Sequence, residues 1–121
     1  MIFIVDDDAA IRESLRFLLS CEGLDARSFE SASRFLESCT LTEQDCVITD
    51  IHLPGMDGLA LLRAIRAKGL KNPVIIMTGW PNSLARQRAA EMGATVFLEK
   101  PLKDAEILAA VRNCLPPSTP G

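Results

Sequence analysis

Short apolar segments alternate along this chain with segments of helical periodicity, and this alternation restricts the possible folds more than any other feature. We expect the five apolar segments to be β-strands, and they are Met1–Val5, Leu24–Phe29, Cys46–Thr49, Val74–Met77 and Thr95–Leu98. A short, continuous apolar run is typical of a strand that is buried on both faces. Strands that alternate with helices form a parallel sheet covered by helices on both sides. The sequence therefore predicts an α/β fold.

The segments between the strands repeat apolar residues three and four positions apart, which places these residues on one side of a helix. In the first such segment the repeat runs from Ile11 to Leu19, and Gly23 follows where a left-handed helix end is expected. The remaining helices are predicted after Ser31, over about Asp57–Lys68, from Pro81 and Asn82 to about Met92, and over about Asp104–Leu115. The helix that ends near Met92 is unusually polar, which is typical of a marginally stable, mobile element.

The composition is that of one soluble globular domain. The chain has 121 residues, of which 48% are hydrophobic and 24% are charged, so it can form one core. A net charge of −3 and a pI near 5.1 argue against direct binding of this domain to a nucleic acid. We expect neither a membrane span nor a secretory signal, because no apolar run is long enough. The domain is expected to cover residues 1–115, and the Pro-rich residues 116–121 to be a linker stub or a disordered tail.

The four cysteines, Cys21, Cys39, Cys46 and Cys114, form no metal-binding pattern. None of them belongs to a C-x-x-C pair, and the only histidine of the chain is His52. A chain with this many apolar residues does not need disulfide bonds to fold. We therefore expect reduced, mostly buried thiols in a cytoplasmic protein.

Charged and hydroxyl side chains stand where four of the predicted strands end. Asp6 and Asp7 follow the first strand, Asp50 follows the third, Thr78 follows the fourth, and Lys100 comes after the fifth. The carboxyl ends of parallel strands meet at one edge of the sheet, where ligands bind in such folds. Carboxylates a few ångströms apart repel one another, and a divalent cation removes this cost. An all-oxygen set without His or Cys ligands indicates Mg²⁺.

Four segments at these strand ends resemble the receiver domains of bacterial two-component response regulators. The segments are Val5–Asp7, Thr49–Gly58, Ile76–Gly79 and Glu99–Pro101. The resemblance covers residues 2 to about 114. Thr49 and the Thr-Gly pair after the fourth strand are similar to the branch that is joined to LuxR-type helix-turn-helix domains. The resemblance implies a flavodoxin-like (βα)5 three-layer sandwich whose five-stranded parallel sheet has the order 2-1-3-4-5.

The resemblance assigns the acidic residues to phosphoryl transfer. It implies that Asp50 is the phosphoacceptor, which takes a phosphoryl group from a phosphohistidine of a sensor histidine kinase. It implies that Asp7 binds Mg²⁺ directly, that Asp6 binds it largely through water, and that Asp50 and the backbone carbonyl of His52 also belong to the metal site. Such a transfer depends on positioning and on neutralising the charge of the phosphoryl oxygens.

The resemblance also implies that residues after the fourth and fifth strands bind and sense the phosphoryl group. The Thr78 hydroxyl is expected to bind one phosphoryl oxygen and Lys100 another, with a cis peptide bond to Pro101 that orients the amine. In the family, the threonine moves toward the phosphoryl group and an aromatic residue on the fifth strand rotates inward. Phe97 occupies that place here and lacks a tyrosine hydroxyl, so it either acts through packing or is a fixed part of the core.

His52 and Trp80 stand two residues after Asp50 and Thr78. In the family these two positions flank the route of the water that hydrolyses the acyl phosphate. We expect the indole of Trp80 to slow hydrolysis by crowding this route, whereas His52 either orders water or lies in solvent. Gly79 is expected to leave space beside the phosphoryl site, because it has no side chain.

These features predict a phosphorylation-controlled switch rather than an enzyme, although the domain is expected to catalyse its own phosphorylation and dephosphorylation. The surface expected to respond comprises the fourth helix, the fifth strand and the fifth helix, and it includes Arg86, Glu91, Phe97 and Lys103. Two outputs stay open. The domain controls transcription through an attached DNA-binding domain, with a homodimer forming on phosphorylation, or it is a stand-alone phosphorelay protein.

Two other classes of protein fit the predicted fold less well. A Mg²⁺-dependent phosphatase that acts through Asp50 on an external substrate needs a second acid in the D-x-D manner, and His52 stands at that position. A flavin-binding electron carrier needs hydroxyl- and Gly-rich loops around the flavin phosphate. The loops after the first and third strands are instead acidic or contain Pro.

Overall fold

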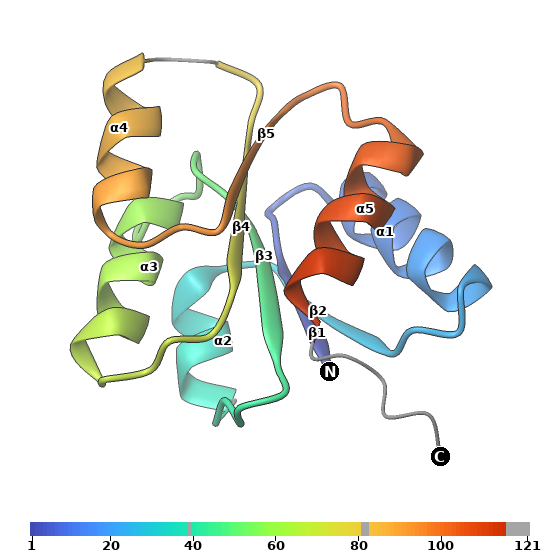
Figure 1. Ribbon diagram of the computed structural model, residues 1–121, viewed down its shortest axis with the longest axis horizontal. Helices are drawn as coiled ribbons and strands as arrows, with labels where there is room; N and C mark the ends of the chain where they lie inside the picture. Colours follow the sequence, from blue (N-terminus) through green and yellow to red (C-terminus); the bar gives the residue numbers. More distant parts are fainter. Residues whose placement is uncertain (39, 81–82, 116–121) are drawn as a thin grey trace.

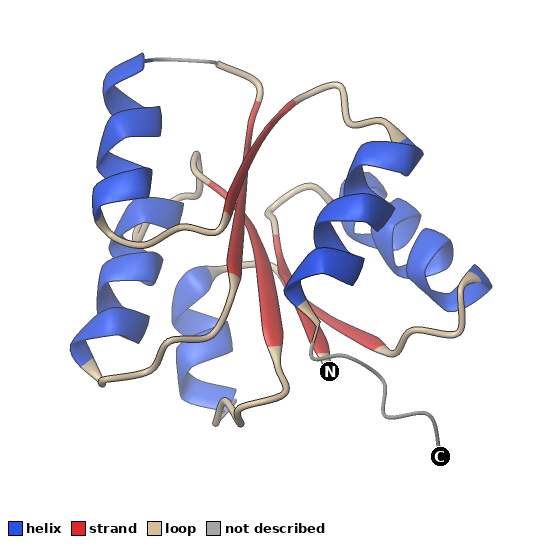
Figure 2. Cartoon of the chain, in the orientation of Figure 1, coloured by secondary structure: helices blue, strands red, loops and turns tan. Residues whose placement is uncertain are grey.

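A parallel five-stranded sheet lies between two layers of helices in the computed structural model, which describes residues 1–38, 40–80 and 83–115 (Figures 1 and 2). The strands are β1 (Ile2–Val5), β2 (Ala26–Phe29), β3 (Cys46–Asp50), β4 (Val74–Thr78) and β5 (Val96–Glu99). Their order in the sheet is β2-β1-β3-β4-β5. The predicted flavodoxin-like (βα)5 sandwich with strand order 2-1-3-4-5 is therefore confirmed.

Helices connect the strands and begin and end close to the predicted residues. They are α1 (Ala9–Cys21), α2 (Ala32–Ser38), α3 (Gly58–Ala67), α4 (Ser83–Glu91) and α5 (Asp104–Cys114). In Figure 1, α1 and α5 cover one face of the sheet, and α2, α3 and α4 cover the other. The predicted helix start at Pro81 and Asn82 and the predicted tail at residues 116–121 lie outside the described residues.

The third aspartate of the acidic run begins α1. The Oδ1 atom of Asp8 accepts hydrogen bonds from the backbone N–H groups of Ala10 at 2.9 Å and Ile11 at 3.4 Å. A cap of this kind satisfies donors that the first turn of a helix leaves without partners, and it is typically worth about 1 kcal/mol. Asp8 therefore has a structural role at the start of α1, which separates it from its neighbours Asp6 and Asp7.

Residues of the central strands pack alternately against the two helical layers. Ile4 and Ile48 lie in the core cluster beneath α1 and α5, whereas Val47 and Ile76 lie in the cluster beneath α2, α3 and α4. Every residue of β1, β3 and β4 is buried. These strands are therefore held on both faces, which makes their carboxyl ends a rigid support for side chains at that edge of the sheet.

The described cysteines are free thiols in two different environments. Cys46 and Cys114 are buried in the core cluster beneath α1 and α5, whereas Cys21 is exposed at the end of α1. A hydrogen bond between the two buried thiols raises the pKa of Cys46 and lowers the pKa of Cys114. Cys39 lies outside the described residues.

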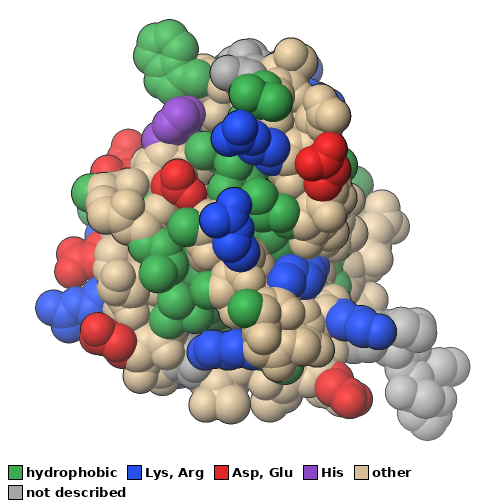
Figure 3. Space-filling view, turned by 90° about the vertical axis from the view of Figure 1, so that its left-hand side faces the viewer, with side chains coloured by type: hydrophobic (Ala, Val, Ile, Leu, Met, Phe, Trp, Pro, Cys, Tyr) green, Lys and Arg blue, Asp and Glu red, His purple; other side chains and the backbone are tan. Residues whose placement is uncertain are grey.

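Helix α4, which the sequence predicts to be marginally stable, has fewer buried residues than any of the other four helices. Ala89 is its buried residue, and Arg88 is exposed. The face formed by α3 and α4 carries Lys and Arg side chains among exposed hydrophobic ones (Figure 3). Within the described ranges, each helix is too short or too polar to span a membrane.

Candidate functional site

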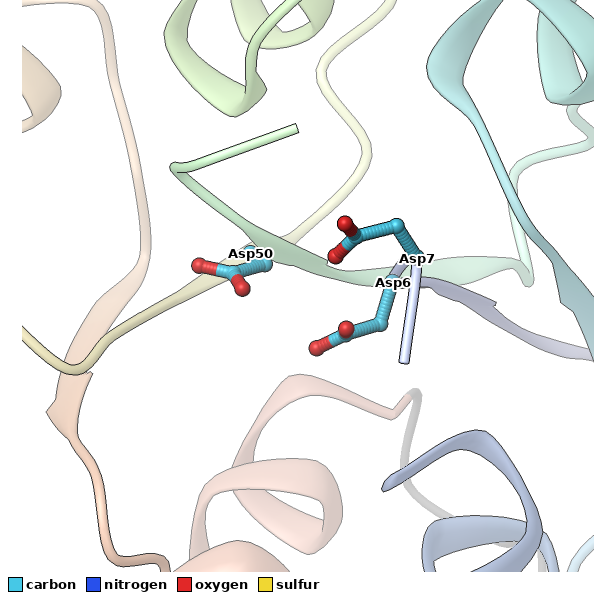
Figure 4. A group of neighbouring side chains, drawn as sticks. All are labelled: Asp6, Asp7 and Asp50. Carbon is cyan, nitrogen blue, oxygen red and sulfur yellow. The ribbon is translucent and has the colours of Figure 1, made fainter. Parts of the chain in front are cut away.

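Three carboxylates from two strand ends meet at the carboxyl edge of the sheet (Figure 4). Asp50 is the last residue of β3, and Asp6 and Asp7 directly follow β1, which is hydrogen-bonded to β3. Each acid offers one oxygen, and these oxygens lie within 4.8 Å of one another. Asp6 and Asp50 are buried, whereas Asp7 is exposed. The structure thus brings together the three acids that the sequence places at the strand ends.

Lys100, which directly follows β5, bridges two of these acids. Its Nζ atom lies 2.8 Å from Oδ2 of Asp50 and 3.2 Å from Oδ2 of Asp6. Burial alone lowers the pKa of the Lys100 ammonium, but the hydrogen bond to Asp50 and the charges of both acids outweigh burial and raise this pKa above 10.5. Burial raises the pKa of Asp6 above 3.8, although the backbone N–H of Asp8 and the Lys100 charge oppose this shift. The single ammonium of Lys100 therefore neutralises only part of the negative charge that three ionised acids would carry.

The carboxylate of Asp50 is fixed through both of its oxygens. Oδ2 accepts from Lys100, and Oδ1 accepts a hydrogen bond of 3.1 Å from the backbone N–H of His52. The backbone carbonyl of Asp50 accepts a hydrogen bond of 3.0 Å from the hydroxyl of Thr49, which is completely buried in β3. The end of β3 therefore presents the carboxylate in one orientation.

Gly58 is a contributor to this site that the sequence reasoning missed. The sequence assigns Gly58 to a turn and helix start, with no role beside Asp50. In the structure, the backbone N–H of Gly58 donates to the carbonyl of Ile51 at 2.9 Å. A Cβ atom added at Gly58 overlaps the carbonyl oxygen of Asp50 and lies 2.9 Å from the Cα atom of Ile51. Only glycine lets α3 begin this close to the end of β3.

Three groups donate hydrogen bonds to Asp6, and the sequence reasoning anticipated none of these contacts; one donor is Lys100. The backbone N–H of Asp8 donates to Oδ1 of Asp6 at 2.9 Å. On the backbone side, Nη1 of Arg12 donates to the carbonyl oxygen of Asp6 at 2.7 Å. Arg12 appears in the sequence only as a polar residue opposite the apolar side of α1, and this spacing carries no signal for the contact.

The hydroxyl of Thr78 is engaged with the loop after β4. Oγ1 accepts a hydrogen bond of 3.0 Å from the backbone N–H of Trp80 and donates one of 3.2 Å to the carbonyl of the same residue. Thr78 is completely buried, and its own carbonyl accepts from the backbone N–H of Lys100 at 2.7 Å. In this structure the hydroxyl thus closes the Trp80 loop, while the Thr78 backbone is tied to the residue that bridges the acids.

Phe97 on β5 is half-buried beneath a charged side chain from α4. The guanidinium carbon of Arg86 lies 4.9 Å from the centre of the Phe97 ring. The same guanidinium forms a salt bridge of 3.0 Å with Glu99. Both partners of this salt bridge are about half exposed, so the pair is worth little by itself. Arg86 nevertheless joins α4 to β5 on the surface that the sequence assigns to the output.

The remaining predicted site residues lie around the rim. His52 and Trp80 are exposed, and 76% of the Trp80 surface is accessible. The peptide bond between Lys100 and Pro101 is cis. A Cβ atom added at Gly79 meets the Lys100 side chain at 3.9 Å, an ordinary contact distance, so the space beside Gly79 is open.

The chemistry of the donor set fits a small divalent cation. The group of carboxylates contains neither His nor Cys among the residues that the structure describes. Three acids face a single ammonium, and burial already raises the pKa of Asp6. A hard cation with oxygen ligands removes this excess of negative charge, and Mg²⁺ keeps some of its waters when it binds in this way.

The comparison with known families agrees with the fold and the acidic site. The family of the response regulator receiver domain matches residues 2–112. The chain therefore belongs to the receiver domain family of two-component response regulators. Receiver domains of this family bind Mg²⁺ at an acidic pocket, and Asp6, Asp7 and Asp50 form such a pocket here.

Regulators of transcription are among the relatives of the chain. It is 43% identical over 114 residues to the transcriptional regulatory protein FixJ of Azorhizobium caulinodans. These aligned residues make up 94% of this chain and 54% of FixJ. It is 37% identical over 115 residues to the DNA-binding transcriptional regulator NtrC of Escherichia coli K12. Here the aligned residues make up 95% of this chain and 24% of NtrC. The crystal structure of FixJ-N has a TM-score of 0.85 at 32% identity, over 93% of this chain and 90% of that one. The chain spans about half the length of its FixJ relatives.

Proposed function

We propose that this domain is a cytoplasmic signalling switch that accepts a phosphoryl group on Asp50 from a phosphohistidine of a sensor histidine kinase. The observation that carries the proposal is the contact of the Lys100 ammonium with Asp50 at 2.8 Å, inside a cluster of three acids. This contact places a fixed positive charge next to the carboxylate oxygen, where a transferred phosphoryl group would develop negative charge. Charge fixed in advance at such a point is usually the largest contribution to catalysis.

The hydrogen bonds that each acid already makes indicate how it would bind Mg²⁺. The exposed carboxylate of Asp7 makes no hydrogen bond with any described residue, so it is free to become a direct ligand. Both carboxylate oxygens of Asp6 are already engaged, which favours contact with the cation through water. Asp50 and the backbone carbonyl of His52 complete the protein ligands. When bound, Mg²⁺ neutralises the charge of the phosphoryl oxygens.

In the transfer step, a carboxylate oxygen of Asp50 attacks phosphorus, and the bond between phosphorus and the donor imidazole nitrogen breaks. The imidazole leaves with the bonding electron pair, and an acyl phosphate remains on Asp50. Lys100 exchanges its contact with Oδ2 of Asp50 for a phosphoryl oxygen. His52 continues to hold Oδ1 through its backbone N–H, so the carboxylate keeps its orientation during the reaction.

The switch depends on whether the Thr78 hydroxyl binds the backbone of Trp80 or a phosphoryl oxygen. In the phosphorylated domain this hydroxyl binds a phosphoryl oxygen and releases the backbone of Trp80. The backbone of Trp80 then changes position, and Phe97 repacks beneath Arg86. The surface formed by α4, β5 and α5 thereby changes its partners, including formation of a homodimer, and controls transcription through an attached DNA-binding domain.

The lifetime of the phosphorylated state depends on two exposed residues at the rim of the site, Trp80 and His52. The indole of Trp80 is exposed beside Thr78 and is large enough to crowd water near the acyl phosphate. His52 follows Asp50 by two residues, and its exposed side chain stands on the rim near the nucleophile. We assign these two residues to tuning of self-catalysed dephosphorylation.

The proposal is tested by incubating the domain with Mg²⁺ and acetyl phosphate and measuring the mass of the intact protein. A gain of one phosphoryl group is expected, and it disappears in Asp50→Asn and in the presence of a chelator. Asp25→Asn is a matched control, because it makes the same substitution at an exposed aspartate outside the cluster of three acids. A mass gain that persists in Asp50→Asn, or no gain in the unchanged protein, contradicts the proposed function.

A further inference from the structure

The backbone carbonyl of Asp6 receives its hydrogen bond from a side chain of the next helix. Asp6 directly follows β1 and is completely buried. Nη1 of Arg12, in the first turn of α1, donates to this carbonyl at 2.7 Å, and no other described residue donates to it. A buried carbonyl without a partner is costly, so the guanidinium satisfies a group that the end of the strand would otherwise leave unpaired.

This hydrogen bond fixes the residue that follows as well. The carbonyl of Asp6 and the N–H of Asp7 belong to one planar peptide unit, so holding the oxygen sets the direction in which the Asp7 backbone leaves. The carboxylate of Asp6 has its own partners, which are the N–H of Asp8 and the ammonium of Lys100. The exposed carboxylate of Asp7 has none among the described residues. Its orientation toward Asp50 therefore depends on the peptide that Arg12 holds.

We propose that Arg12 is a positioning residue for the metal site, which aims the carboxylate of Asp7 by anchoring the peptide between Asp6 and Asp7. The proposal rests on the proposed function, since it concerns the Mg²⁺ site of that function. Residues that orient metal ligands typically change metal affinity by about 10- to 100-fold when they are replaced.

The charge of Arg12 makes the test decisive. Its loss would strengthen cation binding through electrostatics, whereas loss of its positioning role would weaken cation binding. Arg12 carries a positive charge close to a site that binds a cation. If only charge mattered, a neutral residue at position 12 would strengthen cation binding. If Arg12 positions Asp7, the same substitution weakens binding. A weaker affinity therefore cannot arise from the lost charge.

The experiment measures Mn²⁺ binding by the electron paramagnetic resonance signal of the free ion, with Mg²⁺ as competitor. Arg12→Met is compared with Arg16→Met, because Arg16 lies one turn further along α1, is exposed and makes no hydrogen bond or salt bridge with a described residue. We expect about tenfold weaker binding for Arg12→Met. Arg16→Met is expected to bind as tightly as the unchanged protein or slightly more tightly. Arg12→Lys, which restores a charged donor, is expected to recover most of the affinity.

Equal or tighter Mn²⁺ binding by Arg12→Met overturns the positioning role, and so does a loss that Arg16→Met shares. Absence of metal binding in the unchanged protein would instead contradict the proposed function itself. Circular dichroism checks that each variant is folded before its affinity is compared. If Arg12→Met does not fold, Arg12→Gln and Arg16→Gln are compared in the same way, with the same two outcomes.

Discussion

Replacement of Gly58 by alanine tests whether the close approach of α3 to β3 holds Asp50 in place. The added methyl group overlaps the carbonyl oxygen of Asp50 and lies 2.9 Å from both the Asp50 carbonyl carbon and the Ile51 Cα atom. Unstrained contacts between carbon atoms need about 3.5–4 Å, so the end of β3 and the start of α3 must separate by roughly 1 Å. Each neighbouring atom belongs to the backbone, so no flexible side chain can absorb the overlap.

The expected cost has a part in stability and a part in activity. Overpacking of this kind lowers the free energy of unfolding by about 1–3 kcal/mol. A shift of 1 Å at a reacting group reduces the rate by about 100-fold, because Asp50 leaves its 2.8 Å contact with Lys100. Urea denaturation followed by circular dichroism measures the first effect. The rate of mass gain with acetyl phosphate and Mg²⁺ measures the second.

Two other glycines provide matched controls for Gly58→Ala. At Gly79, an added methyl group meets only the Lys100 side chain at 3.9 Å and 4.0 Å. Gly79→Ala is therefore expected to change stability by less than about 0.5 kcal/mol. Gly55 has open space but a φ of +76°, so Gly55→Ala is expected to cost about 1 kcal/mol through backbone strain, with little change in the transfer rate. The reasoning is refuted if Gly58→Ala matches Gly79→Ala in stability and Gly55→Ala in transfer rate.

Three further predictions concern charge and hydrolysis. Because the pKa of Asp6 is raised in the folded state, its contribution to stability is fully present below pH 3.8 and is lost as the pH rises through the folded pKa. Asp6→Asn is therefore expected to be more stable than the unchanged protein at neutral pH without metal; urea titrations across acidic and neutral pH check this, and equal pH dependence of both proteins would contradict it. The pKa of Lys100 is raised, so the stability that this residue contributes is present below pH 10.5 and is lost as the pH rises through the folded pKa. Lys100→Met leaves two buried acids without their ammonium and is expected to lower the free energy of unfolding at neutral pH by about 2 kcal/mol, a loss that Mg²⁺ should partly reverse. Trp80→Ala is expected to shorten the lifetime of phosphorylated Asp50, measured by loss of the phosphoryl mass after donor removal, and an unchanged lifetime would argue against crowding by the indole.

The parts of this fold that the sequence predicts are those set by local pattern. Apolar runs such as Val74–Met77 are typical of strands buried on both faces, and the residue that follows each run then lies at the carboxyl edge of the sheet. The presence of Asp50 and Lys100 at the same edge of the sheet follows from that topology. The strand order and the assigned roles come from the resemblance in the four motifs at the strand ends.

The parts that the sequence does not predict depend on contacts between backbone and side chain across elements. The contact of Gly58 with Asp50 depends on the depth at which α3 starts, and the bond from Arg12 to Asp6 depends on a side-chain conformation. Neither leaves a periodic signal. The partner of the Thr78 hydroxyl is likewise a rotamer choice, since the same residue type can face either the loop or the acids.

The hydroxyl of Thr78 has a single hydrogen, and in this structure it is given to the carbonyl of Trp80. One hydrogen serves one acceptor well, so the loop carbonyl and an incoming phosphate oxygen are competitors for it. A phosphate oxygen that accepted this hydrogen would therefore have to displace the Trp80 carbonyl. Any ligand or partner that draws the Trp80 carbonyl away leaves the hydroxyl ready for phosphate, and by reciprocity phosphate makes the loop easier to capture.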